Sequence, residues 1–347
     1  MEDDNPLFSG RAGHHVGYAE SQDRVHWVKP SLGQYEFNGS NANNIVDLGE
    51  RESGGGHAYM PMVVHDDRET DPARRFKMIV EQRGRNSLHF SPDGIHWTSD
   101  PRNPVAHPRA STAAEYHMIS VWIEEGMYLG LVDSWQHTQV QPQYLMASRD
   151  GVNIFHVFDG RAAIELGKSG AWDSGWISPV NVPVMVGDEI WVYYSGGPRT
   201  IGGHYEDWYD LPMQTGLATI RRDGFVSLDV EEGKASGWFS TIPLRPRGND
   251  LALELNADGL SRGVGRILVD LLADGEVVAT SHAVTEDGVH IAIHWEKGER
   301  LPLPPRASSG CVFFWRARPL STASHFNEDT GLPRAGVLRS RARGKKT

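Results

Sequence analysis

Short apolar stretches, in which apolar and polar positions alternate, recur along most of the chain and predict β-strands rather than helices. A short string between them repeats. Ser21-Gln-Asp-Arg-Val-His-Trp27 matches Ser91-Pro-Asp-Gly-Ile-His-Trp97, and Ser148-Arg-Asp-Gly-Val152 follows as a shorter copy. Asp-Gly between two alternating stretches is typical of a tight hairpin turn, because Gly accepts a positive φ and Asp bonds its own backbone. The repeat therefore predicts a recurring hairpin.

Further apolar strands surround these copies and group into units. Three units of four strands are predicted at about 57–98, 113–157 and 176–228, and residues 14–28 supply only the last two strands of a fourth. Antiparallel four-stranded units that recur along a chain are typical of the blades of a β-propeller. The alternative is a β-sandwich with accidental Asp-Gly hairpins, and the shared strand order of the three units argues against it.

The pattern changes after Val226. Alternating strands are predicted at Leu251–Leu255, Arg266–Leu272, Val277–Val284 and Val289–Trp295. Such a compact antiparallel module favours a β-sandwich. We therefore expect an all-β chain with a β-propeller domain over 1–238, a β-sandwich domain over 239–318 and a basic, disordered tail over 319–347.

The amino-acid composition narrows the range of binding partners and cofactors. The formal charge of -11 argues against a nucleic-acid partner, since phosphate binding needs a basic face. Cys311 is the one cysteine, which excludes an intrachain disulfide and a thiolate metal cluster. The N-terminus lacks the apolar core of a signal peptide, and no apolar run is long enough to span a membrane, so a cytoplasmic location is the default expectation. No cofactor is expected, and the oligomeric state stays open.

Several motifs resemble a known family. Tyr18-Ala-Glu-Ser with the following Asp-Arg-Val-His-Trp, Asn43-Asn-Ile-Val46, Trp172-Asp-Ser-Gly175 and Gly187-Asp-Glu-Ile-Trp-Val-Tyr-Tyr194 are similar to five-bladed propeller proteins of the glycoside hydrolase type, such as invertases and arabinanases. The resemblance covers roughly residues 16 to 300. It implies a five-bladed propeller, a C-terminal β-sandwich, a carbohydrate ligand in the axial cavity and hydrolysis by carboxylates.

The chain also departs from that family. The blade that usually precedes the Tyr-Ala-Glu-Ser stretch is missing or reduced, and in characterised members it carries a catalytic Asp. The Asn-Asp-Pro-Asn-Gly and Glu-Cys motifs of invertases are absent, which argues against a fructosidase. The propeller is therefore expected either to lack a blade at its N-terminus or to be completed by strands that the pattern does not reveal.

Propeller topology sorts the polar residues between two faces. The Ser-x-Asp-Gly turns fall at the bottom of the blades, so Asp23, Asp93 and Asp150 are predicted to be structural turn residues. The segments that precede first strands and follow second strands meet at the top, where the resemblance places the ligand. Acids, His, Arg and Trp gather there, and this composition suits a sugar, because aromatic faces stack on C–H surfaces while charged groups bond hydroxyls.

Glycosidic cleavage typically needs two carboxyl groups, one protonated and one ionised. Our catalytic candidates are Asp173, Glu115 and Asp133. Asp173 lies between Trp172 and Trp176, and burial against these rings would raise its pKa and suit a general acid. Each acid on its own could instead cap a strand end or face solvent. No metal site is predicted, and nine further residues of this rim are expected to bind substrate: His57, Glu81, Arg83, His117, Trp135, Trp176, His204, Glu206 and Trp208.

The leading hypothesis is therefore a glycoside hydrolase-like protein that cleaves a poly- or oligosaccharide, with carboxylates as general acid and as base or nucleophile. The alternative is a non-catalytic carbohydrate-binding propeller, which the reduced first blade favours. A structural scaffold that binds no glycan is the third class.

Overall fold

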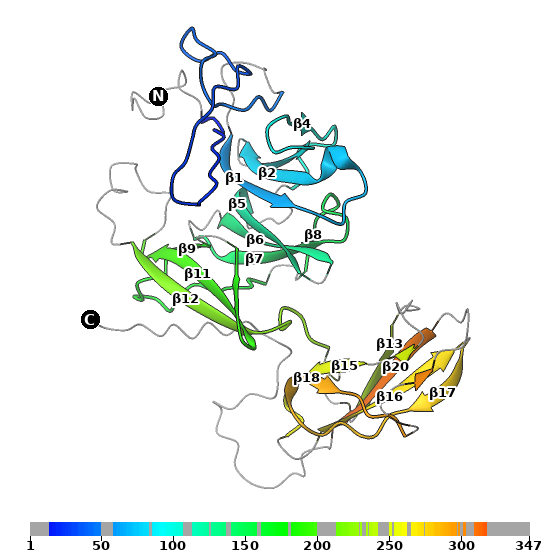
Figure 1. Ribbon diagram of the computed structural model, residues 1–347. Coiled ribbons are helices and arrows are strands. Elements are labelled where there is room, and N and C mark those ends of the chain that lie inside the picture. Colours follow the sequence, from blue (N-terminus) through cyan, green and yellow to red (C-terminus); the bar gives the residue numbers. More distant parts are fainter. Residues whose placement is uncertain are drawn as a thin grey trace. The chain divides into compact units, whose positions relative to one another are not determined.

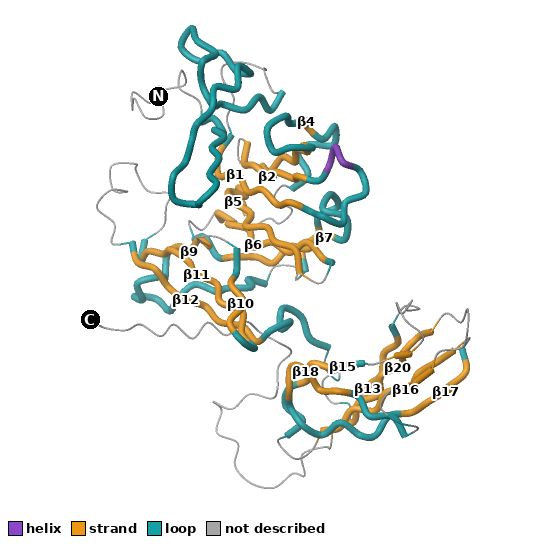
Figure 2. Tube along the Cα trace, viewed as in Figure 1, coloured by secondary structure: helices purple, strands orange, loops and turns teal. Residues whose placement is uncertain are grey.

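The computed structural model describes most of the chain. The described residues are 14–49, 58–82, 85–106, 113–124, 126–136, 140–157, 161–179, 182–199, 213–228, 230, 234, 236–241, 250–251, 253–261, 265–273, 275–296, 298, 301–302 and 309–317. Strands and loops dominate, and the single helical element in these ranges is the 3-10 turn η1, Pro72–Arg74 (Figure 2). The predicted all-β class is confirmed. None of the described helical structure is long and apolar enough for a membrane crossing.

The first two blades have the predicted hairpin order (Figure 1). Blade 1 consists of β1 (Tyr59–His65), β2 (Phe76–Gln82), β3 (Arg85–Ser91) and β4 (Thr98–Ser99). Blade 2 consists of β5 (Ala113–Glu124), β6 (Met127–Gln136), β7 (Gln143–Ser148) and β8 (Phe155–His156). All neighbouring pairs are antiparallel, and the order β1-β2-β3-β4 repeats as β5-β6-β7-β8.

Blade 3 differs from its prediction. It consists of β9 (Trp176–Pro179), β10 (Val184–Val186), β11 (Glu189–Gly197) and β12 (Gln214–Arg221), with β9 and β10 both beside β11. The strand predicted from Pro179 to Val186 is thus split, because Pro179 and Pro183 lack the N–H group that a continuous ladder needs. Residues 222–228 form turns and irregular backbone in place of the predicted outer strand.

The segment that precedes blade 1 forms isolated bridges instead of the two predicted strands. Glu20 bridges Val28 across the Asp23 turn, and Gly17 bridges Ile45. Its apolar residues Val16 and Leu32 pack against a cluster in blade 1 that includes Met78 and Val80. The segment therefore covers one face of blade 1 without regular pairing.

A second core joins blades 1 and 2. Ile79 and Leu88 from blade 1 pack with Ile119, Val132 and Met146 from blade 2, and all five side chains are buried. Burial of this apolar surface is the main force that holds neighbouring blades together. The two blades that carry several of the candidate site residues are therefore fixed relative to each other.

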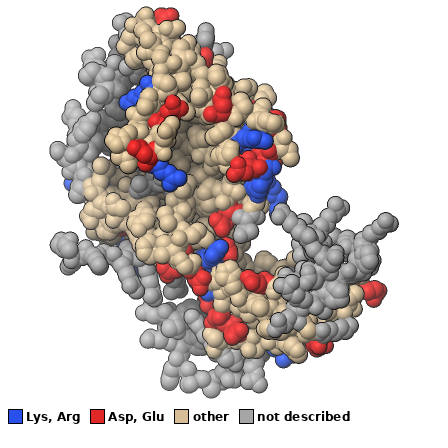
Figure 3. Space-filling view, in the orientation of Figure 1, with Lys and Arg blue, Asp and Glu red and all other residues tan. Residues whose placement is uncertain are grey.

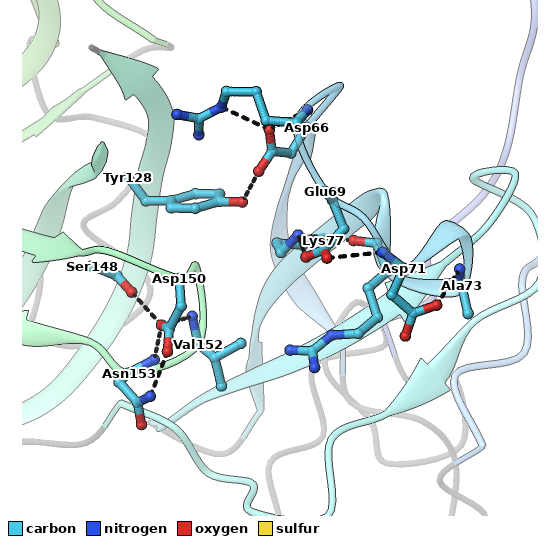
Figure 4. A network of polar contacts seen from close by, with 12 residues as sticks. Asp66, Glu69, Asp71, Ala73, Lys77, Tyr128, Ser148, Asp150, Val152 and Asn153 are labelled. Atoms are coloured by element: carbon cyan, nitrogen blue, oxygen red, sulfur yellow. Dashed lines mark hydrogen bonds and ion pairs between the residues drawn. The ribbon is translucent and has the colours of Figure 1, made fainter. Parts of the chain in front are cut away.

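The Asp-Gly turns are confirmed as structural. Oδ1 of Asp93 accepts the backbone N–H groups of Ile95 and His96, at 2.9 and 2.8 Å. Asp150 makes the same pair of bonds to Val152 and Asn153 (Figure 4). Burial alone would raise the pKa of Asp150, but these N–H donors outweigh it and lower the pKa to about 2.

A polar network beside the Asp150 turn links blade 2 to blade 1 (Figure 4). Tyr128 donates its hydroxyl hydrogen bond to Asp66, which Arg68 Nε also contacts at 3.1 Å. Lys77 Nζ, almost fully buried, donates to Glu69 Oε2 at 2.9 Å. These groups lie at the turn end of the blades, away from the candidate acids, and their arrangement is structural.

The chain divides into two compact units. The second unit comprises Met185–Ile190 and Ile220–Leu338, and the remainder of the chain forms the first. The second unit contains the strands β13 (Ser236–Ser240), β14 (Asp250–Leu251), β15 (Glu254–Ala257), β16 (Gly265–Ala273), β17 (Glu276–Thr280), β18 (Gly288–Ala292), β19 (Leu301–Pro302) and β20 (Ser309–Ala317).

The strands of the second unit pair as β13-β20-β16-β17, β14-β19 and β15-β18. Side chains from both β16 and β18 enter one core around Trp295. A β-sandwich and the bounds 1–238 and 239–318 stay predictions, and the predicted tail 319–347 lies outside the described residues.

Candidate functional site

Asp133 lies on β6 and is 1% exposed. Gln143 Nε2, from β7, donates to its Oδ1 at 2.5 Å, and Ser178 Oγ, from β9, donates to its Oδ2 at 2.6 Å. The carboxyl group therefore connects two strands of blade 2 with the first strand of blade 3. It lies where two blades meet, on a strand whose apolar neighbours keep it out of water.

Burial raises the pKa of Asp133 from 3.8 to about 6. The hydrogen bonds from Ser178 and Gln143 and the positive charge of His117 act in the opposite direction, because each favours the carboxylate. The loss of hydration outweighs them. A carboxyl group that holds its proton close to neutral pH is what a general acid requires.

Two glutamine residues extend this network, Gln143 through its side chain and Gln141 through its backbone. Gln143 Nε2 also donates to the carbonyl oxygen of Ile177 at 2.5 Å, and Gln141 forms a parallel bridge with Trp176. Strand β9 is thus bonded on one edge to Gln141 and on the other to β11. Four buried polar atoms of this network have no hydrogen-bond partner among the described residues: Ser134 Oγ, Gln141 Oε1, Gln143 Oε1 and Trp176 Nε1.

Asp173 precedes β9 and is 7% exposed. Tyr194, on β11, donates its hydroxyl hydrogen bond to Oδ2 of Asp173 at 2.9 Å, and Trp172 stacks on the Tyr194 ring with centroids 5.6 Å apart. A Cβ atom at Gly167 would lie 2.0 Å from Oδ1 of Asp173, so only glycine fits there. The local sequence therefore encodes a tight enclosure for this carboxylate.

The two acids lie on opposite faces of the β9–β11 ladder. Ser178, the partner of Asp133, pairs with Ser195, whereas the partner of Asp173 is Tyr194, the neighbouring residue on the same strand. Side chains of adjacent strand residues point to opposite faces. The structure therefore brings Asp133 and Asp173 to the same pair of strands but separates their carboxyl groups by the ladder.

Glu115 and His117 lie on β5 beside Asp133. Glu115 pairs with Trp135, two residues after Asp133, and the register shifts between Tyr116 and Ile119. His117 and Met118 lie within this irregularity, across from Asp133, and the charge of His117 acts on the carboxyl group. The side chains of Glu115 and Trp135 are outside the described part of the structure, so only their backbone positions are placed.

The remaining predicted residues fall into two groups. Glu81 on β2 and Trp176 on β9 are buried, 5% and 7% exposed, and the indole of Trp176 lies against Gly197. Five others lie outside the described residues: His57, Arg83, His204, Glu206 and Trp208. Their predicted role in substrate binding stays a prediction.

Three residues of this network were missed by the sequence analysis. Gln143, Ser178 and Tyr194 hold the two acids, yet each is one polar position within a strand. The signal that could have found Gln143 is a polar residue at the first position of a mostly apolar strand, and the structure buries this residue completely. Ser178 and Tyr194 carry no comparable signal, because their partners come from elsewhere in the chain.

A cavity of about 40 Å³ lies apart from this network, between blades 1 and 2. Its walls are mostly apolar, and Lys77 and Tyr128 border it. Within the described residues, no group of three His, Cys, Asp or Glu side chains could hold a metal ion. On the face drawn in Figure 3, acidic and basic side chains of the described residues are interspersed.

Comparison with known proteins gives similar structures only. No protein-family model and no curated protein sequence matches this chain. A family-32 β-fructofuranosidase from Bombyx mori matches 88% of this chain and 85% of its own, with 13% identity and a TM-score of 0.40. A fructofuranosidase variant from Schwanniomyces occidentalis, complexed with fructosylnystose, matches 90% of both chains, with 11% identity and a TM-score of 0.37.

A thermostable family-43 glycoside hydrolase matches 48% of this chain and 72% of its own, with 9% identity and a TM-score of 0.26. These neighbours are β-propeller enzymes, as the sequence resemblance implied. A likeness at these identities and TM-scores carries no inference about active-site residues or substrate.

Proposed function

We propose that this protein cleaves a glycosidic bond in an oligo- or polysaccharide, with Asp133 as the source of the proton for the leaving group. The observation that carries the proposal is the buried carboxyl group of Asp133, whose pKa is raised by burial to about 6. A group with this pKa is protonated in a useful fraction of molecules near neutral pH and releases its proton readily. The motifs shared with propeller glycoside hydrolases support a sugar as the substrate.

Asp173 is the proposed second carboxyl group, acting as base or nucleophile. Tyr194 donates a hydrogen bond to its Oδ2, so this oxygen is held as an acceptor. Glycosidic cleavage uses two carboxyl groups, and Asp173 lies at the same pair of strands as Asp133, across the ladder from it. Glu115 is the alternative second carboxyl group, because its backbone lies on the strand next to Asp133.

The test is a search for new reducing ends when the full-length protein is incubated with a panel of oligosaccharides. Asp133→Asn is expected to lower kcat by about 10²–10⁴-fold, the usual contribution of a general acid. Asp173→Asn and Glu115→Gln form separate arms that decide which residue is the second carboxyl group. Asp93→Asn is the matched control, because Asp93 belongs to a turn and not to this network. Turnover at the wild-type rate in Asp133→Asn would overturn the proposal.

A non-catalytic carbohydrate-binding protein is the second candidate. The observation that favours it is the placement of Asp133 and Asp173 on opposite faces of the β9–β11 ladder, each held by partners within the protein. This candidate predicts saturable glycan binding without reducing ends. Calorimetric titration of Trp208→Ala against Asp173→Asn distinguishes it, since binding should be lost only in the Trp208 variant.

A further inference from the structure

The buried carboxyl group of Asp133 needs a route by which its proton can reach a substrate. At 1% exposure the carboxyl group cannot itself touch a glycan. Its neighbours Gln141 and Gln143 are also buried, at 2% and 0% exposure, whereas Ser178 is only half-buried. Ser178 is therefore the hydrogen-bond partner of Asp133 that has surface of its own.

The chemistry of the partners also singles out Ser178. Both N–H groups of the Gln143 amide are used, one for Asp133 Oδ1 and one for the carbonyl oxygen of Ile177. The carbonyl of Ile177 can only accept, so it fixes Nε2 toward Asp133, and this nitrogen cannot take up a proton. A hydroxyl group both donates and accepts. Ser178 Oγ can therefore accept a proton from Asp133 Oδ2 at the same position where it now donates.

We propose that the Ser178 hydroxyl group relays the proton of Asp133 from the junction between the blades to the outside. The proposal rests on the function proposed above where the acceptor is a glycan, and it extends that function by one residue. In the protonated state Oδ2 of Asp133 carries the proton and donates it to Ser178 Oγ. The hydroxyl hydrogen of Ser178 then points outward.

The glycosidic C–O bond breaks, its electron pair stays on the leaving oxygen, and that oxygen takes the hydroxyl proton of Ser178. Ser178 Oγ takes the proton of Asp133 Oδ2 in the same step. Asp133 is left as a carboxylate, Ser178 is unchanged, and its hydroxyl donates to Oδ2 as in the described geometry. A water molecule completes the hydrolysis at the sugar carbon and returns one proton to Asp133.

One other titratable group faces Asp133 among the described residues. His117 approaches from β5 and acts on the carboxyl group through its charge. The groups that approach from β7, β9 and the segment before β7 are Gln143, Ser178 and Gln141, none of which titrates. A change in the behaviour of Asp133 on substitution of Ser178 therefore reports the loss of the hydroxyl group.

The experiment measures how fast the carboxyl proton of Asp133 exchanges with D₂O. Infrared difference spectra of the full-length protein at a pH below 6 give the C=O band of the protonated group, and Asp133→Asn identifies that band. Ser178→Ala is expected to slow the exchange at least several-fold, because the buried proton loses its outward route. Ser178→Thr keeps the hydroxyl and should exchange at the wild-type rate.

Ser195→Ala is the matched control, since Ser195 pairs with Ser178 across the same ladder. Exchange in Ser178→Ala at the wild-type rate, or equal slowing in Ser195→Ala, would overturn the relay. The glycan assay is carried out on the same variants. A functioning relay should also give Ser178→Ala a lower kcat with little change in KM. Slowed exchange in Ser178→Ala without any glycan cleavage by the wild type would support the relay and refute the glycosidase.

Discussion

Asp133 is subject to opposing influences. Loss of hydration favours the neutral acid, while two donors and a nearby histidine favour the carboxylate. Removing a charged group from water costs more than a few hydrogen bonds restore, unless the pairing is complete. Burial therefore prevails, and a residue within β6 acquires the raised pKa that a general acid requires.

This balance predicts a pH-dependent stability. The pKa of Asp133 is about 6 in the folded chain and 3.8 ordinarily, so its contribution to the unfolding free energy is fully present below pH 3.8 and is lost as pH rises through 6. The difference in unfolding free energy between wild type and Asp133→Asn should shift against the wild type across this window. Urea denaturation at several pH values measures it, and a difference independent of pH would contradict the raised pKa.

The sequence marks the two acids as candidates, but it does not reveal which side chains bond to them. Asp133 and Asp173 stand out because they follow or precede apolar strands, which is a local pattern. That Tyr194 donates to Asp173, or that Ser178 donates to Asp133, depends on how separate strands pair. When two strands are far apart in the sequence, their register is set by the packing of the whole structure. A single residue within a strand therefore gives no local indication of its partner.

At the scale of elements, two separate requirements favour glycine in the Asp-Gly turns: a positive φ and the lack of space for a Cβ atom. Gly94 and Gly151 have φ of 78° and 70°, a region that other residues adopt at a cost. A Cβ at Gly151 would lie 2.7 Å from Tyr128 Cζ, whereas at Gly94 the nearest atom, Phe76 Cε1, is 3.7 Å away. Arg24 occupies the equivalent position of the first copy at φ 63°, so a side chain there is tolerated where space allows.

We therefore expect Gly151→Ala to destabilise the protein more than Gly94→Ala. The Gly94 variant should cost about 1–2 kcal/mol for the backbone alone. The Gly151 variant should cost a further 1–3 kcal/mol or so, because the methyl group overpacks against Tyr128 and Lys77. Equilibrium unfolding in urea compares the two, and equal losses would show that the close contact at Gly151 is unimportant.

In two segments, the apolar pattern predicts strands that differ from those in the structure. The apolar stretch from Pro179 to Val186 predicts one strand, but its two prolines interrupt the ladder and leave β9 and β10 as separate strands. The break matters for the candidate site, since it lets short β9 pair with both Gln141 and β11. In the N-terminal segment, alternation is present but regular pairing is not, so an alternating pattern did not suffice for a strand.

At the scale of the molecule, each compact unit has its own apolar core. In the second unit Trp295 is 2% exposed and central to its cluster. Trp295→Ala should therefore cost about 3–5 kcal/mol in the second unit, and Val277→Ala, at a site 57% exposed, should cost little. Hydrogen exchange of the β16 amides measures both, and similar protection in the two variants would contradict the central place of Trp295.

If Asp133 supplies the proton for glycosidic cleavage, the pH dependence of kcat/KM must follow the ionisation of its carboxyl group. The wild type should lose activity as pH rises through about 6, since Asp133 must hold its proton in the free protein. Asp133→Asn should retain only a weak activity without that alkaline limb. A wild-type profile that stays level through pH 6, or the same limb in Asp133→Asn, would contradict the account.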